Sequence, residues 1–150
     1  MIKYIKGDLF LGKEDIIVHG CNCFCTFGAG IAYQLKKLYP EAFQIDQQTI
    51  KGDRLKLGTY TQWNGKHYLY PERNIIIINA YTQYYYANEG LKPFDYQAFL
   101  IILDKLKENF KDKTIAMPKI GAGLAGGDWK IIEKMINDVF EEKEIIIYIL

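Results

Sequence analysis

The sequence lacks the long apolar segments of a membrane-spanning or exported protein. Its uninterrupted apolar runs, such as Ile75–Ile78 and Ile145–Leu150, are far shorter than the roughly 20 residues that cross a bilayer. The first residues, Met1–Lys6, alternate between apolar and polar side chains and do not form the apolar stretch of a signal peptide. We therefore expect a cytoplasmic protein that does not associate with membranes.

The chain also has little net charge and few arginines. Nineteen lysines and arginines stand against 18 aspartates and glutamates, which leaves a formal net charge of +1. Such a balance gives little attraction to duplex nucleic acid, so we expect no stable binding to it. Only Arg54 and Arg73 carry a guanidinium group. If the protein binds phosphates, backbone N–H groups must supply most of the donors.

Cysteine is scarce, and all of it lies in one short segment at Cys21, Cys23 and Cys25. An odd number of cysteines in a chain of this kind argues against a disulfide framework. In an extended strand the three thiols and His19 would point to the same side, so a metal site is conceivable. A zinc site, however, needs about four ligands and usually shows Cys-x-x-Cys spacing. We favour thiols that are packed or that lie next to a functional site, and expect no metal and no cofactor.

Features of disorder and of multidomain organisation are missing as well. Apolar residues make up 49% and charged residues 25% of the 150 residues, which is typical of a soluble globular protein. The sequence has no Ser/Pro-rich linker, no low-complexity tract and no long-period repeat. We expect residues 1–150 to form a single domain.

Extended and helical patterns alternate along the chain. We predict strands near Ile2–Lys6, Ile16–Gly20, Gly58–Trp63, Lys66–Tyr70, Asn74–Tyr81, Thr114–Pro118 and Glu144–Leu150, and helices over Gly30–Tyr39, Glu41–Thr49, Asp95–Phe110 and Asp128–Phe140. Asn64-Gly65 is a two-residue hairpin signal, which would make one strand pair antiparallel. Continuous apolar strands that alternate with helices indicate a sheet covered on both faces. The predicted fold class is α/β, a three-layer α/β/α sandwich with a mixed, mostly parallel sheet.

Two of these strands lead into glycine-rich turns that open helices. The first turn contains Phe27-Gly28-Ala29-Gly30, and the second runs from Gly121 to Gly127. Glycine lets backbone N–H groups approach an anion closely, and a helix N-terminus adds partial positive charge. Because such turns gather at the carboxyl ends of strands, two neighbouring turns suit a diphosphate. The alternative is a pair of tight turns without a ligand.

The second turn formally matches the dinucleotide-binding pattern Gly-x-Gly-x-x-Gly, at Gly121, Gly123 and Gly126. That unit needs an acidic residue about 20 positions further on, at the end of the next strand. Here the next strand runs into Leu150, and its acidic residues come before it. A nicotinamide-dependent dehydrogenase is therefore disfavoured, and neither turn is a P-loop.

Three segments resemble the macro domain family. They are Gly7-Asp8-Leu9, the segment from His19 to Leu35 that reads His-Gly-Cys-Asn-Cys followed by Gly-Ala-Gly-Ile-Ala-Tyr-Gln-Leu, and Met117–Leu124. The resemblance extends over essentially the whole chain. It is strongest to the branch of ADP-ribose 1″-phosphate phosphatases, and the branch that hydrolyses terminal ADP-ribose from proteins or DNA has similar loops. It implies that the chain binds ADP-ribose or ADP-ribose 1″-phosphate, with an ADP-ribosylated protein or nucleic acid end as a further partner.

The resemblance also implies positions for the ligand. Asp8 and Leu9 would contact the adenine, with Tyr148 and Leu150 nearby, and Asn22 would hold the distal ribose. The two turns would bind the diphosphate through Gly28, Ala29, Gly30, Ile31, Ile120, Gly121, Ala122, Gly123 and Leu124. Without the resemblance, Asp8 would be interpreted as a turn residue and Asn22 as a polar loop residue.

Three residues are candidates for catalysis. His19, at the end of an apolar strand, has a side chain whose ordinary pKa near 6.5 suits proton transfer, although a core histidine bonded to backbone is equally consistent. Asn79 could orient a water molecule or a ribose hydroxyl. Asp128 could face the distal ribose, or it could simply cap the helix that it begins. The glycohydrolase branch uses a lysine at the end of the central strand, and residues 77–83 contain none, which makes a covalent route doubtful.

The remaining aromatic and histidine residues have open roles. Tyr81 and the tyrosines Tyr84–Tyr86 could cover the ligand, fold over a shallow core or form a dimer contact. His67 lies in the predicted hairpin, where we expect it to be exposed. The leading interpretation is a hydrolase of ADP-ribose derivatives. A non-catalytic ADP-ribose reader and a scaffold with an empty cleft remain alternatives.

Overall fold

The computed structural model describes residues 1–86, 93–123 and 125–150. Its strands are β1 (Ile2–Lys6), β2 (Ile16–Cys21), β3 (Tyr60–Lys66), β4 (Asn74–Tyr81), β5 (Ile115–Met117) and β6 (Ile145–Ile149). Its α-helices are α1 (Gly30–Leu38), α2 (Pro40–Gln47), α3 (Tyr96–Asn109) and α4 (Trp129–Val139), with short 3-10 helices at Leu9–Leu11 and Arg54–Lys56. None of the helices in these ranges is long and apolar enough to cross a membrane.

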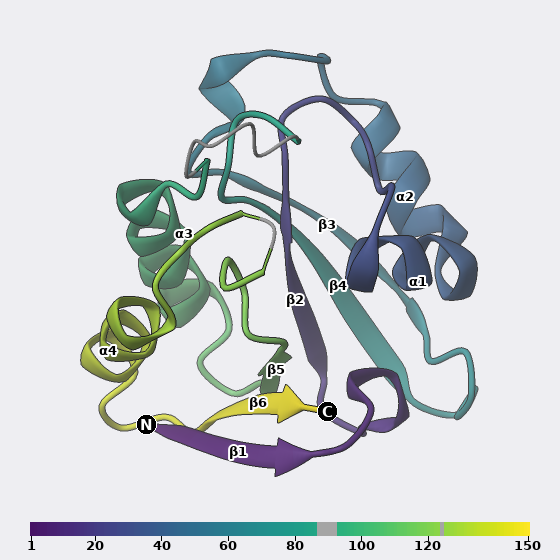
Figure 1. The fold of residues 1–150 in the computed structure, drawn as a ribbon. Coiled ribbons are helices and arrows are strands. Elements are labelled where there is room, and N and C mark those ends of the chain that lie inside the picture. The colour runs from purple at the N-terminus through teal and green to yellow at the C-terminus, as the bar shows by residue number, and fades with distance from the viewer. Residues whose placement is uncertain (87–92, 124) are drawn as a thin grey trace.

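The strands form one sheet in the order β1-β6-β5-β2-β4-β3, in which only the β3–β4 pair is antiparallel. Figure 1 shows α1 and α2 on one face of the sheet and α3 and α4 on the other. This is the predicted three-layer sandwich with a mixed, mostly parallel sheet. The connection from β2 crosses one face and that from β5 crosses the other, although β2 and β5 are neighbours. A crevice at their carboxyl ends is where such sheets bind ligands.

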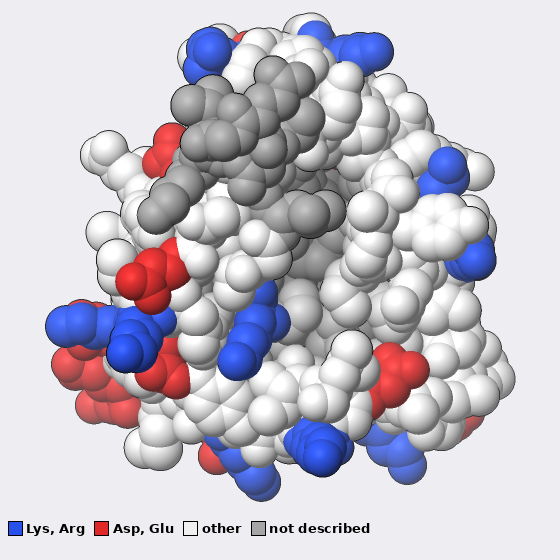
Figure 2. All heavy atoms as spheres, viewed as in Figure 1, with Lys and Arg blue, Asp and Glu red and all other residues white. Residues whose placement is uncertain are grey.

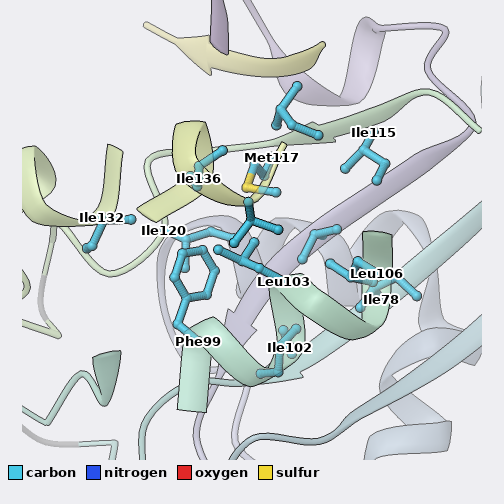
Figure 3. Close-up of a cluster of buried hydrophobic side chains, with 14 of the residues drawn as sticks. Ile78, Phe99, Ile102, Leu103, Leu106, Ile115, Met117, Ile120, Ile132 and Ile136 are labelled. Atoms are coloured by element: carbon cyan, nitrogen blue, oxygen red, sulfur yellow. The ribbon is translucent and has the colours of Figure 1, made fainter. Parts of the chain in front are cut away.

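Each face of the sheet has its own apolar core because strand residues alternate between the two faces. Val18 and Ile78 pack with Phe99 and Leu103 of α3 and with Ile136 of α4 (Figure 3). The other face contains a second cluster, which joins Ile17, Ile77 and Tyr81 to Leu35 of α1 and Ala42 of α2. The central strands β2, β4 and β5 are therefore covered on both faces, and the cleft lies at their ends.

The helices begin and end close to the predicted positions. Asp95 and Asp128 each accept a hydrogen bond from a backbone N–H of the first turn, which caps α3 and α4. The apolar positions of α3 recur at helical spacing, so Phe99, Ile102 and Leu106 are all buried.

The predicted hairpin turn at Asn64-Gly65 is wrong, and so is the predicted strand Lys66–Tyr70. Both residues lie inside β3, which pairs with β4 from Tyr60↔Ala80 to Lys66↔Asn74, so the turn lies in residues 67–73. A Cβ on Gly65 would lie 2.2 Å from Cζ2 of Trp63, so this glycine leaves room for the indole ring rather than making a turn.

The expectation that His67 is exposed is also wrong. Only 2% of His67 is exposed. Its Nδ1 accepts hydrogen bonds from the backbone N–H groups of Leu69 and Tyr70, and its Nε2 lies 3.1 Å from the carbonyl oxygen of Gly12. Since Nδ1 is an acceptor, Nε2 carries the proton and donates it to that carbonyl. Burial lowers the pKa of His67, which keeps the ring neutral in this role.

Candidate functional site

A cleft of about 700 Å³ opens at the carboxyl ends of β2, β4 and β5. Figure 2 shows a hollow on this face, bordered mostly by uncharged side chains. Of the predicted site residues, those that line the cleft are His19, Asn22, Gly28, Ala29, Gly30, Ile31, Ile120, Gly121 and Gly123. The two glycine turns therefore meet in one cleft, although they lie about ninety positions apart in the sequence.

The first turn presents an uncapped helix start to the cleft. Helix α1 follows Ala29, which has no side chain that can accept a hydrogen bond, and its first turn holds no acidic residue. Its first intrahelical hydrogen bond runs from the N–H of Tyr33 to the carbonyl oxygen of Ala29, so the N–H groups of Gly30, Ile31 and Ala32 have no partner within the helix. An uncapped N-terminus with its partial positive charge is suited to bind an anion.

The second turn is held in a conformation that requires glycine. Gly121 has φ +78°, and a Cβ on it would lie 2.4 Å from Cδ1 of the buried Phe94. Its carbonyl oxygen accepts a hydrogen bond of 2.7 Å from the N–H of Gly127, which closes the turn. The backbone beside the cleft is therefore fixed by the Phe94 ring and by a turn that only glycine adopts without strain.

Gly121→Ala is expected to lower the free energy of unfolding by about 2–4 kcal/mol, because the methyl group adds left-handed strain and overlaps the Phe94 ring. Gly123→Ala is the matched control, since a Cβ there has no neighbouring heavy atom within 4 Å and its φ is not in the left-handed region. Urea unfolding of both variants measures the difference. Equal stabilities of the two would contradict the packing described above.

His19 lies at the wall of the cleft, and a hydrogen bond to Asn79 of the neighbouring strand β4 holds its ring in place. The two residues are opposite each other in the β2–β4 register, and His19 Nε2 lies 2.6 Å from Asn79 Oδ1. The Asn79 amide nitrogen donates to the carbonyl oxygen of Ala42 and to the hydroxyl of Thr61. This pairing orients the amide so that Oδ1 faces His19 as an acceptor, and Nε2 therefore carries the ring proton.

The His19 ring is neutral at pH 7 and has one unprotonated nitrogen, Nδ1. Only 1% of the residue is exposed, and desolvation lowers its pKa to about 4, against a smaller upward effect of the Asn79 hydrogen bond. The nearest sulfur is Cys21 Sγ, 3.5 Å from Nε2, and burial raises the pKa of that thiol so that it stays protonated. Cys21 Sγ also lies 3.8 Å from Nδ1, so the residue that lines the cleft is an uncharged histidine whose Nδ1 faces a protonated thiol.

Asn22 already uses part of its amide to shape the first turn. Its Nδ2 donates to the backbone oxygen and the hydroxyl of Thr26, and its Oδ1 accepts from the N–H of Phe24. A carbonyl oxygen has two lone pairs, so Oδ1 can accept one further hydrogen bond. Towards a ligand, Asn22 can therefore act as an acceptor for a hydroxyl group.

Several predicted site residues lie outside the cleft lining. These are Asp8, Leu9, Asn79, Tyr81, Ala122, Asp128, Tyr148 and Leu150. Asp128 is exposed and caps α4. Tyr81 is buried, and its hydroxyl donates to the buried carboxylate of Asp46. Leu124 lies outside the described residues. The roles proposed for all of these residues stay predictions.

The four residues predicted near adenine lie at the carboxyl ends of β1 and β6, on the same side of the sheet as the cleft. Gly7 and Asp8 follow β1, and Tyr148 is paired with Ile5 in the neighbouring β6. Both strands are parallel to β5, so their carboxyl ends point to the same edge. Asp8 accepts a hydrogen bond from the N–H of Phe10 through Oδ1, which leaves Oδ2 for another partner.

Some cleft residues were not assigned to the site from the sequence. They are Gly20, Cys21, Thr26, Ala32, Thr82, Gln83, Pro118, Lys119 and Ala125. Tyr86, one of the tyrosines that could cover the ligand, also lines the cleft. The signal that could have found Thr82 and Gln83 is their place directly after β4, at the edge where the two glycine turns meet. The three cysteines are free thiols, and the described residues hold no group of three His, Cys, Asp or Glu side chains arranged for a metal ion.

Comparison with known proteins agrees with this arrangement. Residues 18–136 match the Macro domain family. The chain belongs to this family. It is 36% identical to a 17.5 kDa protein from the tk-vs intergenic region of Enterobacteria phage T4, over 98% of this chain and 95% of the phage protein.

Two other relatives carry names that state an activity. The ADP-ribose 1″-phosphate phosphatase of Debaryomyces hansenii is 28% identical, over 99% of both chains. The DNA ADP-ribosyl glycohydrolase of Mycobacterium bovis is 29% identical over 95% of this chain, which spans 39% of that longer protein.

Proposed function

We propose that this macro domain protein binds ADP-ribose in the cleft and hydrolyses an ADP-ribose derivative, with ADP-ribose 1″-phosphate as the leading substrate. The observation that carries the proposal is the uncapped N-terminus of α1 opposite the glycine turn of residues 121–127. Unpartnered N–H groups from a helix start can hold a diphosphate without any arginine. The phosphatase named among the relatives matches the chain over its whole length, which supports the substrate.

The reaction would be the attack of water on phosphorus, which breaks the bond between phosphorus and the C1″ oxygen and yields ADP-ribose and inorganic phosphate. His19 is the candidate base, because its Nδ1 is unprotonated at neutral pH and the residue lines the cleft. Asn79 would keep the ring in this tautomer. The backbone N–H groups of the two turns would stabilise the charge that develops on the phosphoryl oxygens.

The adenine end of the ligand would reach beyond β5 towards β6 and β1. Asp8 would accept a hydrogen bond from the adenine amino group through Oδ2, which is not used by the Phe10 N–H. At the other end, Asn22 Oδ1 would accept from a hydroxyl of the distal ribose. These assignments use the lone pairs that the folded chain leaves free.

Removal of ADP-ribose from a macromolecule is the second candidate function. The mycobacterial relative named as a DNA ADP-ribosyl glycohydrolase favours it. A lysine nucleophile is missing from residues 77–83, so this reaction would also have to use water. Purified protein incubated separately with ADP-ribose 1″-phosphate, ADP-ribosylated DNA and ADP-ribosylated protein distinguishes the substrates. Binding of ADP-ribose without turnover of any of the three would indicate a reader.

Gly28→Val tests whether the cleft is the binding site. A Cβ on Gly28 meets no heavy atom within 4 Å, so we expect valine to project into the cleft without disturbing the fold. The variant should bind ADP-ribose about 100-fold more weakly or worse by calorimetry, equivalent to about 3 kcal/mol. Its unfolding temperature without ligand should stay close to the wild-type value. Unchanged affinity in a folded variant would place the ligand elsewhere.

A further inference from the structure

One wall of the cleft contains a buried hydroxyl group that has no hydrogen-bond partner among the described residues. Among the buried side-chain oxygen and nitrogen atoms of the described residues, only Thr82 Oγ1 and Glu14 Oε1 lack a hydrogen bond. Glu14 lies outside the cleft lining, whereas Thr82 belongs to it although only 1% of the residue is exposed. Buried hydroxyls are normally hydrogen-bonded, because burial without a partner forfeits the bond to water.

The backbone holds Thr82 firmly in place. Its N–H donates to the carbonyl oxygen of Cys21 over 3.2 Å, and its own carbonyl oxygen accepts from the N–H of Asp95 over 2.7 Å. The first bond joins the residue to the end of β2, and the second joins it to the residue that caps α3. Thr82 is therefore a fixed part of the cleft wall. These two backbone hydrogen bonds prevent the residue from moving far enough to bring its hydroxyl to a partner elsewhere in the chain.

The Thr82 hydroxyl lies close to the end of β2 and to the residue that precedes the second glycine turn. A Cβ on Gly20, near the end of β2, would lie 2.9 Å from Thr82 Oγ1 and 3.2 Å from Cγ2 of Ile120. Both side chains therefore pack against the backbone of Gly20, and only glycine fits at this position. Ile120 immediately precedes the second turn, and β2 leads into the first. Because Thr82 directly follows β4, it lies on the side of the cleft where the diphosphate and the distal ribose would bind, away from the adenine candidates on β1 and β6.

We propose that Thr82 is a ligand-binding residue, whose hydroxyl donates a hydrogen bond to one oxygen of the sugar–diphosphate part of the ligand. This inference rests on the proposed function and adds to it a side-chain contact at the cleft wall. A single ligand oxygen is the partner that we infer, because only 1% of Thr82 is exposed although the residue lines the cleft. A ligand oxygen beside this hydroxyl satisfies the only buried side-chain oxygen or nitrogen of the cleft wall that lacks a hydrogen bond among the described residues.

Thr82→Val removes the hydroxyl and keeps the shape of the side chain, and Thr82→Ser keeps the hydroxyl. Calorimetry with ADP-ribose should show about 5- to 10-fold weaker binding for the valine variant, which is the effect of one neutral hydrogen bond. The serine variant should bind within about 2-fold of the wild type, since it keeps the donor. Without ligand, the valine variant should be at least as stable as the wild type, because it no longer buries an unpaired hydroxyl.

Thr59→Val is the matched control. The Thr59 hydroxyl donates to the carbonyl oxygen of Lys56 over 2.6 Å, and Thr59 lies outside the cleft lining. This variant should lose stability without ligand and bind ADP-ribose as the wild type does. A similar loss of stability in Thr82→Val would show that its hydroxyl has a partner within the chain, and would overturn the inference.

The binding measurements separate this inference from the proposed function. If the wild type binds ADP-ribose and Thr82→Val binds it equally tightly, the Thr82 contact is refuted while the proposed function stands. If the wild type binds no ADP-ribose, the proposed function fails and the contact fails with it. The stability comparison between Thr82→Val and Thr59→Val is made without ligand, so it reports on the unpaired hydroxyl in either case.

Discussion

His19→Ala is expected to reduce the release of phosphate from ADP-ribose 1″-phosphate by about 100-fold or more, the usual effect of losing a general base. The reason is that His19 lines the cleft as a neutral residue with Nδ1 unprotonated, in a tautomer fixed by the 2.6 Å hydrogen bond to Asn79. A phosphate-release assay at pH 7 measures the loss. Binding of ADP-ribose by the same variant should change little, which separates catalysis from binding.

The pH dependence of the wild-type rate gives a second readout of the same role. Because burial lowers the pKa of His19 to about 4, the base form persists well below the ordinary pKa of a histidine. The acidic limb of kcat/KM should therefore lie near pH 4 and not near pH 6.5. A limb near 6.5, or a His19→Ala variant as active as the wild type, would contradict this assignment.

Acid is expected to destabilise the fold through the same residue. The unfolded chain titrates His19 near its ordinary pKa of about 6.5, and the folded chain titrates it at about 4. Since the folded pKa is the lower one, the unfolded state binds more protons between these values, and stability falls as the pH falls through this window. At 1.36 kcal/mol per pH unit, the loss from His19 between pH 7 and pH 4 is about 3 kcal/mol.

Urea unfolding of the wild type and of His19→Asn at pH 7 and pH 4 measures this contribution. Asparagine cannot be protonated in this range, so the variant should lose about 3 kcal/mol less than the wild type between the two pH values. Other titrating groups, including His67 with its lowered pKa, are present in both proteins and cancel in the comparison. Identical pH dependence of the two proteins would refute the prediction, as would a His19 resonance that titrates near pH 6.5 by NMR.

Local patterns in the sequence were sufficient to predict the positions of most helices and strands. The helices are found within one or two residues of their predicted positions because apolar spacing and aspartate caps act within a few residues. The glycine turns could also be predicted, because their glycines lie within a few residues of one another. The prediction of a turn at Asn64-Gly65 was wrong because these residues continue β3, where the Trp63 ring occupies the space over Gly65. The prediction that His67 is exposed was wrong because its partners, Gly12 and the turn after β3, come together only in the folded chain.

The amino-acid order by itself determined where the backbone can approach an anion. Glycines and an alanine at the start of α1 leave N–H groups uncapped whatever surrounds them, and the family motifs consist of these same residues. Tertiary structure decided which polar side chains are paired. His19 and Asn79 lie 60 positions apart, and the parallel register of β2 and β4 places them opposite each other. Long-range pairing sets burial, and burial sets the pKa of His19 and leaves the Thr82 hydroxyl without a partner.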